Sequence, residues 1–253
     1  MIVEVYFKDM ESSIAIKLER HAREIEEHLP FKSKARVWKE EVYFESPIEI
    51  KGDLELVNRA FKGEVYYWPP GKALCIFYGI SQPYTPIAWI GTLLDPVSRV
   101  YEVCDGVSVE VRRHEVSDEY RGIVDALERL GYTTATPLDE GSRIVVAAKR
   151  REAGGAGGAR RLALLVYPES YGLYIEGEPL FKYHGTARDM GTIEALERRL
   201  GEELKPEYAR LDIVEECYIA ITACTASQEE LERAVVELER AYLLAIEMLA
   251  RSP

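Results

Sequence analysis

The chain has 253 residues, of which 47% are hydrophobic, and its formal net charge is -12. This content allows a full core in one large domain or two ordinary ones, and it excludes a disordered protein. The negative charge argues against a nucleic-acid-binding protein, because phosphate backbones require clustered lysine and arginine. No apolar run reaches the roughly 20 residues needed to cross a bilayer, and the first residues lack signal-peptide features. We therefore expect a cytoplasmic protein that binds neither nucleic acid nor membrane.

Amides are scarce in a chain that is 30% charged, since Asn58 is the only asparagine and Gln82 and Gln228 are the only glutamines. Heat-adapted proteins show this composition, because amides deamidate and networks of ion pairs gain value at high temperature. The composition therefore predicts a thermophilic source.

The first half of the chain is dominated by expected strands. Residues 2–7 and 14–18 flank a polar turn and predict a hairpin. A short helix follows and ends at Pro30. Further strands are expected at residues 35–44, 65–68, 73–78, 87–94 and 107–114. Many strands with one short helix predict a mostly β barrel or a sandwich.

From Ser117 onward the pattern changes to a mixture of helices and strands. Two helices are expected, at residues 123–130 and 189–200, each followed by a glycine typical of helix ends. Apolar runs predict strands at residues 144–148, 162–167, 171–176 and 213–223. We therefore expect a first domain of residues 1–116 and an α+β domain of residues 117–253, whose role the sequence does not indicate.

The chain closes with a long helix that the sequence specifies well. Ser227 and Glu230 have the spacing of a capping box, in which a hydroxyl and a carboxylate satisfy opposite backbone amides. Apolar residues then recur every three to four positions, at Leu231, Val235, Leu238, Tyr242, Ala245 and Leu249. This stripe predicts packing on the sheet of its own domain, or a helix–helix contact in a homo-oligomer.

Two further features argue against a phosphate or metal site. The glycine-rich segment 150–160 has basic flanks, but it joins two expected strands, whereas a phosphate-binding loop joins a strand to a helix. We interpret it as an exposed hairpin loop. The cysteines form no Cys-x-x-Cys pair and lack histidines at ligand spacing, so we expect no metal and no cofactor. Cys75 and Cys217 are expected to be buried thiols, and a disulfide between Cys217 and Cys224 is left open.

The segment 38–44 offers a candidate carboxylate. If residues 35–44 form one strand, Trp38, Glu40 and Phe44 share a face, because side chains alternate along a strand. Glu40 would then lie among apolar neighbours, where its charge must be satisfied or its pKa raised. The alternative is that Trp38 and Glu40 lie at a strand end, close to solvent.

Two segments resemble a known family. Residues 38–47 read WKEEVYFESP and residues 67–79 read YWPPGKALCIFYG. Together they are similar to a family of small prokaryotic cyclophilin-like proteins of undetermined function, over roughly residues 1–115. The resemblance implies a closed β-barrel with a cyclophilin-type strand arrangement for this half of the chain only.

Prolyl isomerase activity does not follow from this resemblance, because a shared fold does not carry activity. Isomerases of the cyclophilin fold contain Phe-His-Arg, Gln-Gly-Gly-Asp and Asn-Gly-Ser-Gln-Phe-Phe segments, and none of these occurs in this chain. The catalytic arginine of those enzymes therefore has no counterpart here.

We expect a groove on the barrel that binds a small molecule or a peptide. Its candidate residues are the aromatic and charged side chains of the two segments, namely Trp38, Glu40, Phe44, Trp68, Lys72 and Phe77. For Phe44 and Phe77 the barrel core is the favoured alternative, and an exposed turn would accommodate Lys72. The leading hypothesis is a binding protein without efficient isomerase activity. The alternatives are an enzyme that uses Glu40 as acid or base, a residual isomerase, and an assembly module built on the terminal helix.

Overall fold

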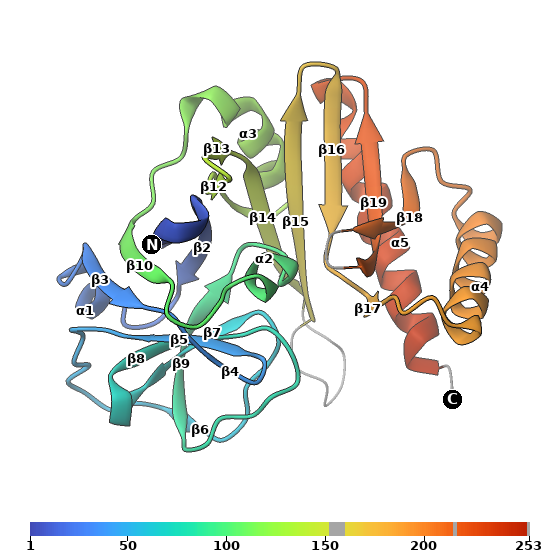
Figure 1. The fold of residues 1–253 in the computed structure, drawn as a ribbon. Coiled ribbons are helices and arrows are strands. Elements are labelled where there is room, and N and C mark those ends of the chain that lie inside the picture. The colour runs from blue at the N-terminus through green and yellow to red at the C-terminus, as the bar shows by residue number, and fades with distance from the viewer. Residues whose placement is uncertain (152–159, 215–216, 252–253) are drawn as a thin grey trace.

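The computed structural model describes residues 1–151, 160–214 and 217–251, and the first half of the chain is a nearly closed antiparallel barrel (Figure 1). In spatial order its strands are β3 (Phe31–Lys34), β10 (Ser108–Arg113), β1 (Ile2–Phe7), β2 (Ser12–Leu18), β9 (Ile87–Leu93), β7 (Glu64–Trp68), β8 (Ala73–Phe77), β5 (Glu41–Glu45) and β4 (Arg36–Trp38), and β6 (Leu56–Val57) pairs with β9. The connections include α1 (Ala22–Glu26), α2 (Ser98–Tyr101) and the 3-10 turns η1 (Lys8–Met10) and η2 (Pro69–Gly71). The predicted mostly β barrel is confirmed.

At β8 the barrel sheet is buried on both of its faces. Phe44 of β5 pairs with Leu74 of β8, and both belong to the main core of the barrel. Cys75 and Phe77 of β8 belong instead to a second cluster on the outer face, which Ala60 covers from the loop before β7. Successive side chains of a strand point to opposite faces. A strand buried on both sides therefore needs a continuous apolar run, and residues 73–77 supply one.

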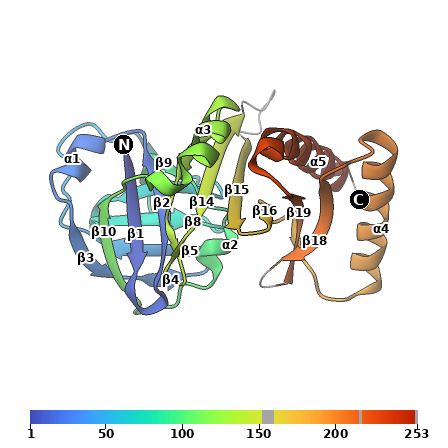
Figure 2. The same ribbon diagram turned by 90° about the horizontal axis from the view of Figure 1, so that it is seen from above.

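The second half contains an antiparallel sheet with helices packed on it, as the predicted α+β class requires (Figure 2). The strand order is β11 (Thr133–Ala135), β14 (Val145–Arg151), β15 (Arg160–Glu169), β16 (Gly172–Gly177), β19 (Tyr218–Thr225) and β17 (Phe181–Lys182), with β18 (Ala209–Val214) also paired to β19. A small hairpin joins β12 (Leu138–Asp139) to β13 (Ser142–Arg143). The helical segments are η3 (Asp118–Tyr120), α3 (Arg121–Arg129), α4 (Ala187–Glu203), η5 (Gln228–Glu230) and α5 (Leu231–Arg251). The long helix α5 contacts β16, β18, β19, α3 and α4.

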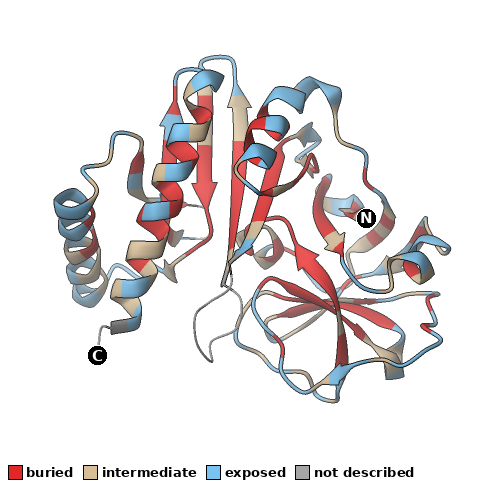
Figure 3. Ribbon diagram, turned by 180° about the vertical axis from the view of Figure 1, so that it is seen from behind, coloured by how far each residue is buried: buried red, intermediate tan, exposed pale blue. Residues whose placement is uncertain are grey.

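Strand β14 is the place where the two halves of the chain share buried surface. Val145 and Ala147 belong to the core beneath the helices. Val146 and Ala148 face the other way and pack with Ala15 of the barrel. Figure 3 shows the helices of the second half lying over buried strands, with the outer surfaces of these helices exposed. The apolar runs in β14 and β15 are therefore long because both faces of these strands are covered.

A buried arginine joins the two halves with polar contacts. The Arg161 side chain is only 6% exposed; its Nε donates to the Leu93 carbonyl at 2.9 Å, and its Nη1 donates to Glu178 Oε2 at 2.9 Å. A further hydrogen bond runs from Nη2 to the Asp95 carbonyl. Nearby, Tyr101 of α2 stacks on Tyr218 of β19 with ring centroids 4.7 Å apart. The predicted boundary at residue 116 stays a prediction, but a packed interface joins the elements on its two sides.

Two expected strands are in fact pairs of strands. The predicted strand 35–44 is wrong because the chain turns at Lys39, whose φ is 56°, so β4 and β5 form a hairpin. The predicted strand 213–223 is also wrong, since β18 ends at Val214 and β19 begins at Tyr218. Cys217, with a φ of 59°, precedes the second strand. Both turns use a left-handed residue other than glycine, which the sequence does not signal.

The helix ends also differ in detail from the predictions. Helix α4 continues past Gly201 to Glu203. It starts with a capping box between Thr186 and Asp189. At the start of α5 the predicted capping box is wrong, because the Ser227 side chain caps no amide and Glu230 accepts from the Ala226 amide at 3.3 Å, one residue before the expected cap. No helix of the described residues is long and apolar enough to cross a membrane.

The remaining predictions concern cysteines and the glycine-rich segment. All four cysteines are free thiols, so the disulfide left open between Cys217 and Cys224 does not form. Cys75 is buried as expected, whereas Cys217 is exposed because it lies at the turn before β19. The strands that flank the glycine-rich segment are antiparallel partners, and Arg150 pairs with Arg161. Residues 152–159 themselves lie outside the described residues.

Candidate functional site

A pocket of about 240 Å³ lies on the outer face of the barrel. It is lined by aromatic and apolar side chains around one carboxylate, namely Trp38, Glu41, Tyr43, Trp68, Pro83, Tyr84 and Ile87. The volume is several times the roughly 30 Å³ that one water molecule occupies in the liquid. The pocket is therefore large enough for a small ligand or for the end of a long side chain.

The hairpin of β4 and β5 places most of the polar wall. Trp38 and Glu41 are directly opposite each other in the strand pairing, and Tyr43 follows Glu41 on the same face. The Tyr43 ring meets the Trp68 ring at 82° with centroids 6.4 Å apart. Trp68 is held at the end of β7 because its Nε1 donates to Thr85 Oγ1 at 2.7 Å. Contacts within the barrel thus position the Trp68 indole and the Tyr43 phenol.

Glu41 is the chemically distinctive member of the pocket. It is only 7% exposed, and burial raises the pKa of its carboxyl group. The Cys75 thiol beneath it hydrogen-bonds the carboxylate and partly opposes that rise. The same burial, together with the neighbouring carboxylate, raises the pKa of Cys75 well above its ordinary value, so the thiol stays protonated and is a poor nucleophile. The described residues form no ion pair with Glu41.

The loop between β8 and β9 lines another side of the pocket, through Pro83 and Tyr84. Glu40, in the hairpin turn, holds this loop by accepting a hydrogen bond from the Ile80 amide at 2.7 Å. The Tyr78 hydroxyl donates to the Lys39 carbonyl at 2.9 Å and fixes the start of the same loop. In the same loop, the side chains of Ile80 and Tyr84 are each 88% exposed. The loop is therefore anchored near its start and carries two exposed apolar side chains.

Gly79→Ala is expected to release this anchor. A Cβ at position 79 would lie 2.2 Å from Cδ of Glu40, so the carboxylate must move away from the Ile80 amide. We expect a loss of about 1 kcal/mol of stability, the net value of one such hydrogen bond, measured by chemical denaturation. Gly52→Ala is the matched control, because a Cβ there meets nothing within 4 Å. Equal stability of the two variants would contradict the anchoring role of Glu40.

The structure brings together only some of the candidates predicted from the sequence. Trp38 and Trp68 line the pocket. Glu40 lies at the turn and binds the loop, while Phe44 is fully buried in the barrel interior. The ligand-binding roles of these residues stay predictions, as does acid–base chemistry by Glu40.

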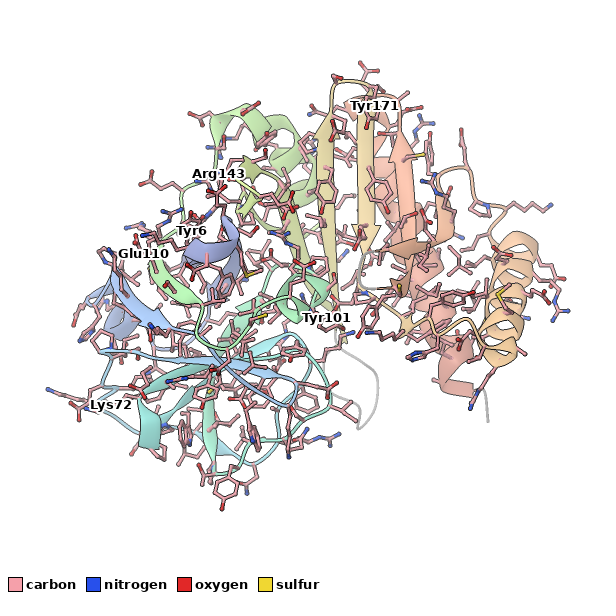
Figure 4. All side chains as sticks on the ribbon, viewed as in Figure 1. Tyr6, Lys72, Tyr101, Glu110, Arg143 and Tyr171 are labelled. Atoms are coloured by element: carbon pink, nitrogen blue, oxygen red, sulfur yellow. The ribbon has the colours of Figure 1, made fainter. Side chains whose placement is uncertain are left out.

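The two other candidates lie apart from the pocket lining. Phe77 is 1% exposed and packs edge-on against Tyr66, in the cluster on the outer face of the barrel sheet. The Lys72 side chain is half exposed, and its Nζ lies 3.4 Å from Oε2 of Glu49. In Figure 4 it lies at the edge of the barrel that is remote from the second half of the chain. The core alternative for Phe77 and the exposed-turn alternative for Lys72 therefore describe their surroundings better than a shared groove does.

Sequence reasoning missed Glu41, Tyr43 and Tyr84. The first two lie close to Trp38 and Glu40 in the sequence. A predicted turn at residues 39 and 40 would have indicated them as members of the site. Pairing across a hairpin then places Glu41, rather than Glu40, next to Trp38. Tyr84 lies in the segment Gln82-Pro83-Tyr84-Thr85-Pro86, whose two prolines predict a loop, but nothing local shows which strand ends the loop covers. Among the described residues no group of three histidines, cysteines or acids is arranged to hold a metal ion.

Comparison with known proteins identifies the first half of the chain. Residues 1–112 match the family model described as Cyclophilin-like. The solution structure of a hypothetical protein from Archaeoglobus fulgidus shares 27% sequence identity over 45% of this chain and 94% of that one, with a TM-score of 0.39. A search of the curated proteins found no significant match. The barrel is therefore a cyclophilin-like domain, as the resemblance in residues 38–47 and 67–79 implies, and the family match does not extend beyond residue 112.

Proposed function

We propose that the cyclophilin-like domain is a binding module and that its ligand, a small molecule or a side chain of a peptide, occupies the pocket between Trp38 and Trp68. The observation that carries the proposal is the composition of the pocket, in which aromatic walls surround a single buried carboxylate. Ligand sites are usually concave and apolar, with a few polar groups that orient the ligand. The pocket beside Trp68 has this composition.

The exposed apolar loop supports a ligand that extends beyond the pocket. Ile80 and Tyr84 are both 88% exposed, although folding normally covers such side chains when it can. Both belong to the loop that Glu40 anchors. A ligand that fills the pocket and lies against this loop would cover the two side chains, which favours a peptide or an elongated small molecule.

Catalysis is the weaker proposal for this site. Prolyl isomerases of this fold use an arginine, and none occurs among the described residues that line the pocket. The carboxylate of Glu40 is engaged by the Ile80 amide at 2.7 Å. Clear turnover of a proline peptide in a protease-coupled assay, lost in Glu40→Gln, would nevertheless establish the enzyme alternative.

A ligand screen on the intact chain tests the binding proposal. The chain has three tryptophans, and Trp38 and Trp68 line the pocket while Trp89 does not. Small molecules and peptides that raise the melting temperature are expected to change tryptophan fluorescence and to bind at least about tenfold more weakly to Trp68→Ala, equivalent to about 1.4 kcal/mol. Trp89→Phe is the matched control, because Trp89 packs in the same outer cluster and its ring contacts Arg20 and Arg150.

The screen gives a clear negative result as well. If no compound class raises the melting temperature, the domain is not a binding module of this kind. If compounds bind but Trp68→Ala and Trp89→Phe retain the same affinity, binding takes place elsewhere on the chain and the pocket is not the site.

A further inference from the structure

We propose that the pocket beside Trp68 selects organic cations, with a quaternary or methylated ammonium group as the preferred ligand. This inference rests on the binding function proposed above and names the ligand class. Trp38, Tyr43, Trp68 and Tyr84 line the same pocket as the carboxylate of Glu41. The quadrupole of an aromatic ring attracts a cation to the ring face, and several such rings together form the cages in which proteins hold methylated ammonium groups.

One wall of the pocket already binds a cation. The Lys39 ammonium lies 4.4 Å from the centre of the Trp38 ring, within the range of about 6 Å in which a cation and a ring attract each other. Lys39 is exposed at the hairpin turn, so no packing forces it onto the indole. A cation thus lies within attractive range of this ring.

Glu41 supplies the charge selection. Burying a carboxylate is costly unless a cation or hydrogen bonds compensate for the lost water. Among the described residues, the weak donor Cys75 is the one group that compensates for the burial of Glu41. A ligand ammonium would provide the missing countercharge, whereas a neutral ligand would bury the carboxylate further and an anion would be repelled. The expected order of affinity is cation, then neutral, then anion.

The charge of the whole chain acts in the same direction. The formal net charge is -12, and a protein of this charge attracts cations from solution and repels anions. This field does not distinguish one cation from another. Selection of a methylated ammonium comes from the aromatic walls, because a small hydrated metal ion gains less from apolar rings than a large, weakly hydrated organic cation does.

The pH dependence separates this proposal from another ligand chemistry. A cation binds the ionised form of Glu41, so its affinity should increase as the pH rises through the raised pKa of that group. A neutral ligand that accepts a hydrogen bond from the protonated carboxyl group should bind more weakly over the same interval. The titratable groups beside Glu41 are Cys75 from β8, Tyr43 from its own strand and Tyr84 from the loop, while the Lys39 ammonium lies over the neighbouring Trp38 ring. The thiol stays protonated over this range because burial raises its pKa.

Choline and its neutral carbon isostere, in which a tert-butyl group replaces the trimethylammonium group, form the decisive pair of probes. Calorimetric titration of the full chain is expected to show at least tenfold tighter binding of choline. Glu41→Gln keeps the shape of the side chain and should lose about tenfold in choline affinity while leaving the isostere unchanged. Lys39→Met removes the competing ammonium and should strengthen choline binding about threefold. Trp68→Phe, a milder change than removal of the ring, tests the cage if Glu41→Gln fails to fold.

The possible results separate the ligand class from the proposed function. Equal affinity for choline and the isostere, both weakened by Trp68→Ala, would overturn the cation inference and leave the binding function standing. Choline binding that Glu41→Gln does not change would also overturn the inference. Failure of both probes, of tetramethylammonium and of a trimethyllysine peptide would overturn the cation inference, while the broader ligand screen decides separately whether the pocket is a binding site. Tighter binding of the trimethyllysine peptide than of free choline would identify a modified protein as the source of the cation, and the reverse order would identify a free metabolite.

Discussion

Asp95→Asn is expected to make stability independent of one buried proton. The unaltered protein should lose about 4 kcal/mol of stability through this group as the pH rises from about 4 to 7, and the variant should not. Asp95 follows β9, is fully buried, and accepts a hydrogen bond from the Ala15 amide at 2.7 Å. Its second oxygen has no hydrogen-bond partner and lies 3.9 Å from Nε of Arg99. Burial raises the pKa of this carboxyl from 3.8 to about 7, although Arg99 and Arg161 oppose the rise.

The direction of the effect follows from where the proton is bound. Between these two pKa values the folded chain holds a proton on Asp95 that the unfolded chain has released. The folded state therefore binds more protons in this interval, and its stability falls as the pH rises. Asparagine cannot ionise, yet its carbonyl can still accept from the Ala15 amide. The variant should consequently lack this part of the pH dependence, whatever its stability at low pH.

Chemical denaturation at several pH values between about 4 and 8 measures the difference between the two profiles. Asp105→Asn is the matched control, because Asp105 is 56% exposed and pairs with Arg36 at 3.1 Å on the surface. This control should keep the full pH dependence. Identical profiles for all three proteins would mean that Arg99 and Arg161 keep Asp95 ionised throughout the interval, and that the interface between the two halves carries a permanent buried charge.

The fold was largely predictable because its elements are short and strongly patterned. The hairpin of β1 and β2, the strands β14 and β15 and the helix α5 all follow from apolar runs or helical periods that a single segment contains. The errors fall where one residue adopts a left-handed backbone without being glycine, as at Lys39 and Cys217. Such a turn depends on the strands it connects, and those contacts are made by distant parts of the chain.

The candidate site was less predictable because one turn exchanges the faces of a strand. With a continuous strand from residue 35 to 44, Glu40 shares a face with Trp38; with the hairpin, Glu41 does. The sequence contains both carboxylates, and only the turn decides which of them is buried in the pocket. Tyr84 is further from prediction still, since it reaches the pocket from a loop more than 40 positions after Glu41.

The join between the two halves is the part of the molecule that no local pattern indicates. Buried polar residues such as Asp95 and Arg161 meet only after both sheets have formed. The hairpin of β12 and β13 extends the same join, since the Leu138 amide donates to Ser13 Oγ at 2.7 Å and the Glu140 amide donates to Ser12 Oγ at 3.0 Å. These partners are about 125 positions apart in the sequence. Their pairing cannot be predicted until the fold shows that the two segments lie side by side.

Glu4→Gln is expected to cost about 3 kcal/mol of stability at neutral pH and almost nothing near pH 2. The carboxylate of Glu4 is 3% exposed and accepts from Ser13 Oγ at 2.8 Å, Arg112 Nη2 at 3.0 Å, His114 Nδ1 at 3.4 Å and Arg143 Nη1 at 3.4 Å. Burial opposes ionisation, but these donors together lower its pKa from 4.5 to about 2. A carboxylate with a depressed pKa stabilises the folded state above its unfolded pKa, and this contribution is lost as the pH falls through the folded one.

Glutamine at position 4 can replace only some of these interactions. It keeps one carbonyl acceptor, but its amide group faces donors and it carries no charge for Arg112 and Arg143. His114 is held in one tautomer here, because its Nε2 accepts from the Thr136 amide at 3.0 Å and Nδ1 must therefore donate to Glu4. Loss of the acceptor would leave a buried N–H without a partner, which is the costly case for a hydrogen bond.

Glu110→Gln provides the matched control for denaturation at neutral and acidic pH. Glu110 lies on the neighbouring strand β10, and its 3.9 Å ion pair with Lys32 is exposed to solvent (Figure 4). A surface pair of this kind contributes at most about 1 kcal/mol, so this variant should stay close to the unaltered protein. Arg143 belongs to β13 of the second half, and the Glu4 variant should therefore also expose the joint between the halves to hydrogen exchange and proteolysis. Equal stability of the two variants at neutral pH would show that water replaces Glu4 as the partner of Arg112 and Arg143, and that the other contacts between the halves hold them together without this carboxylate.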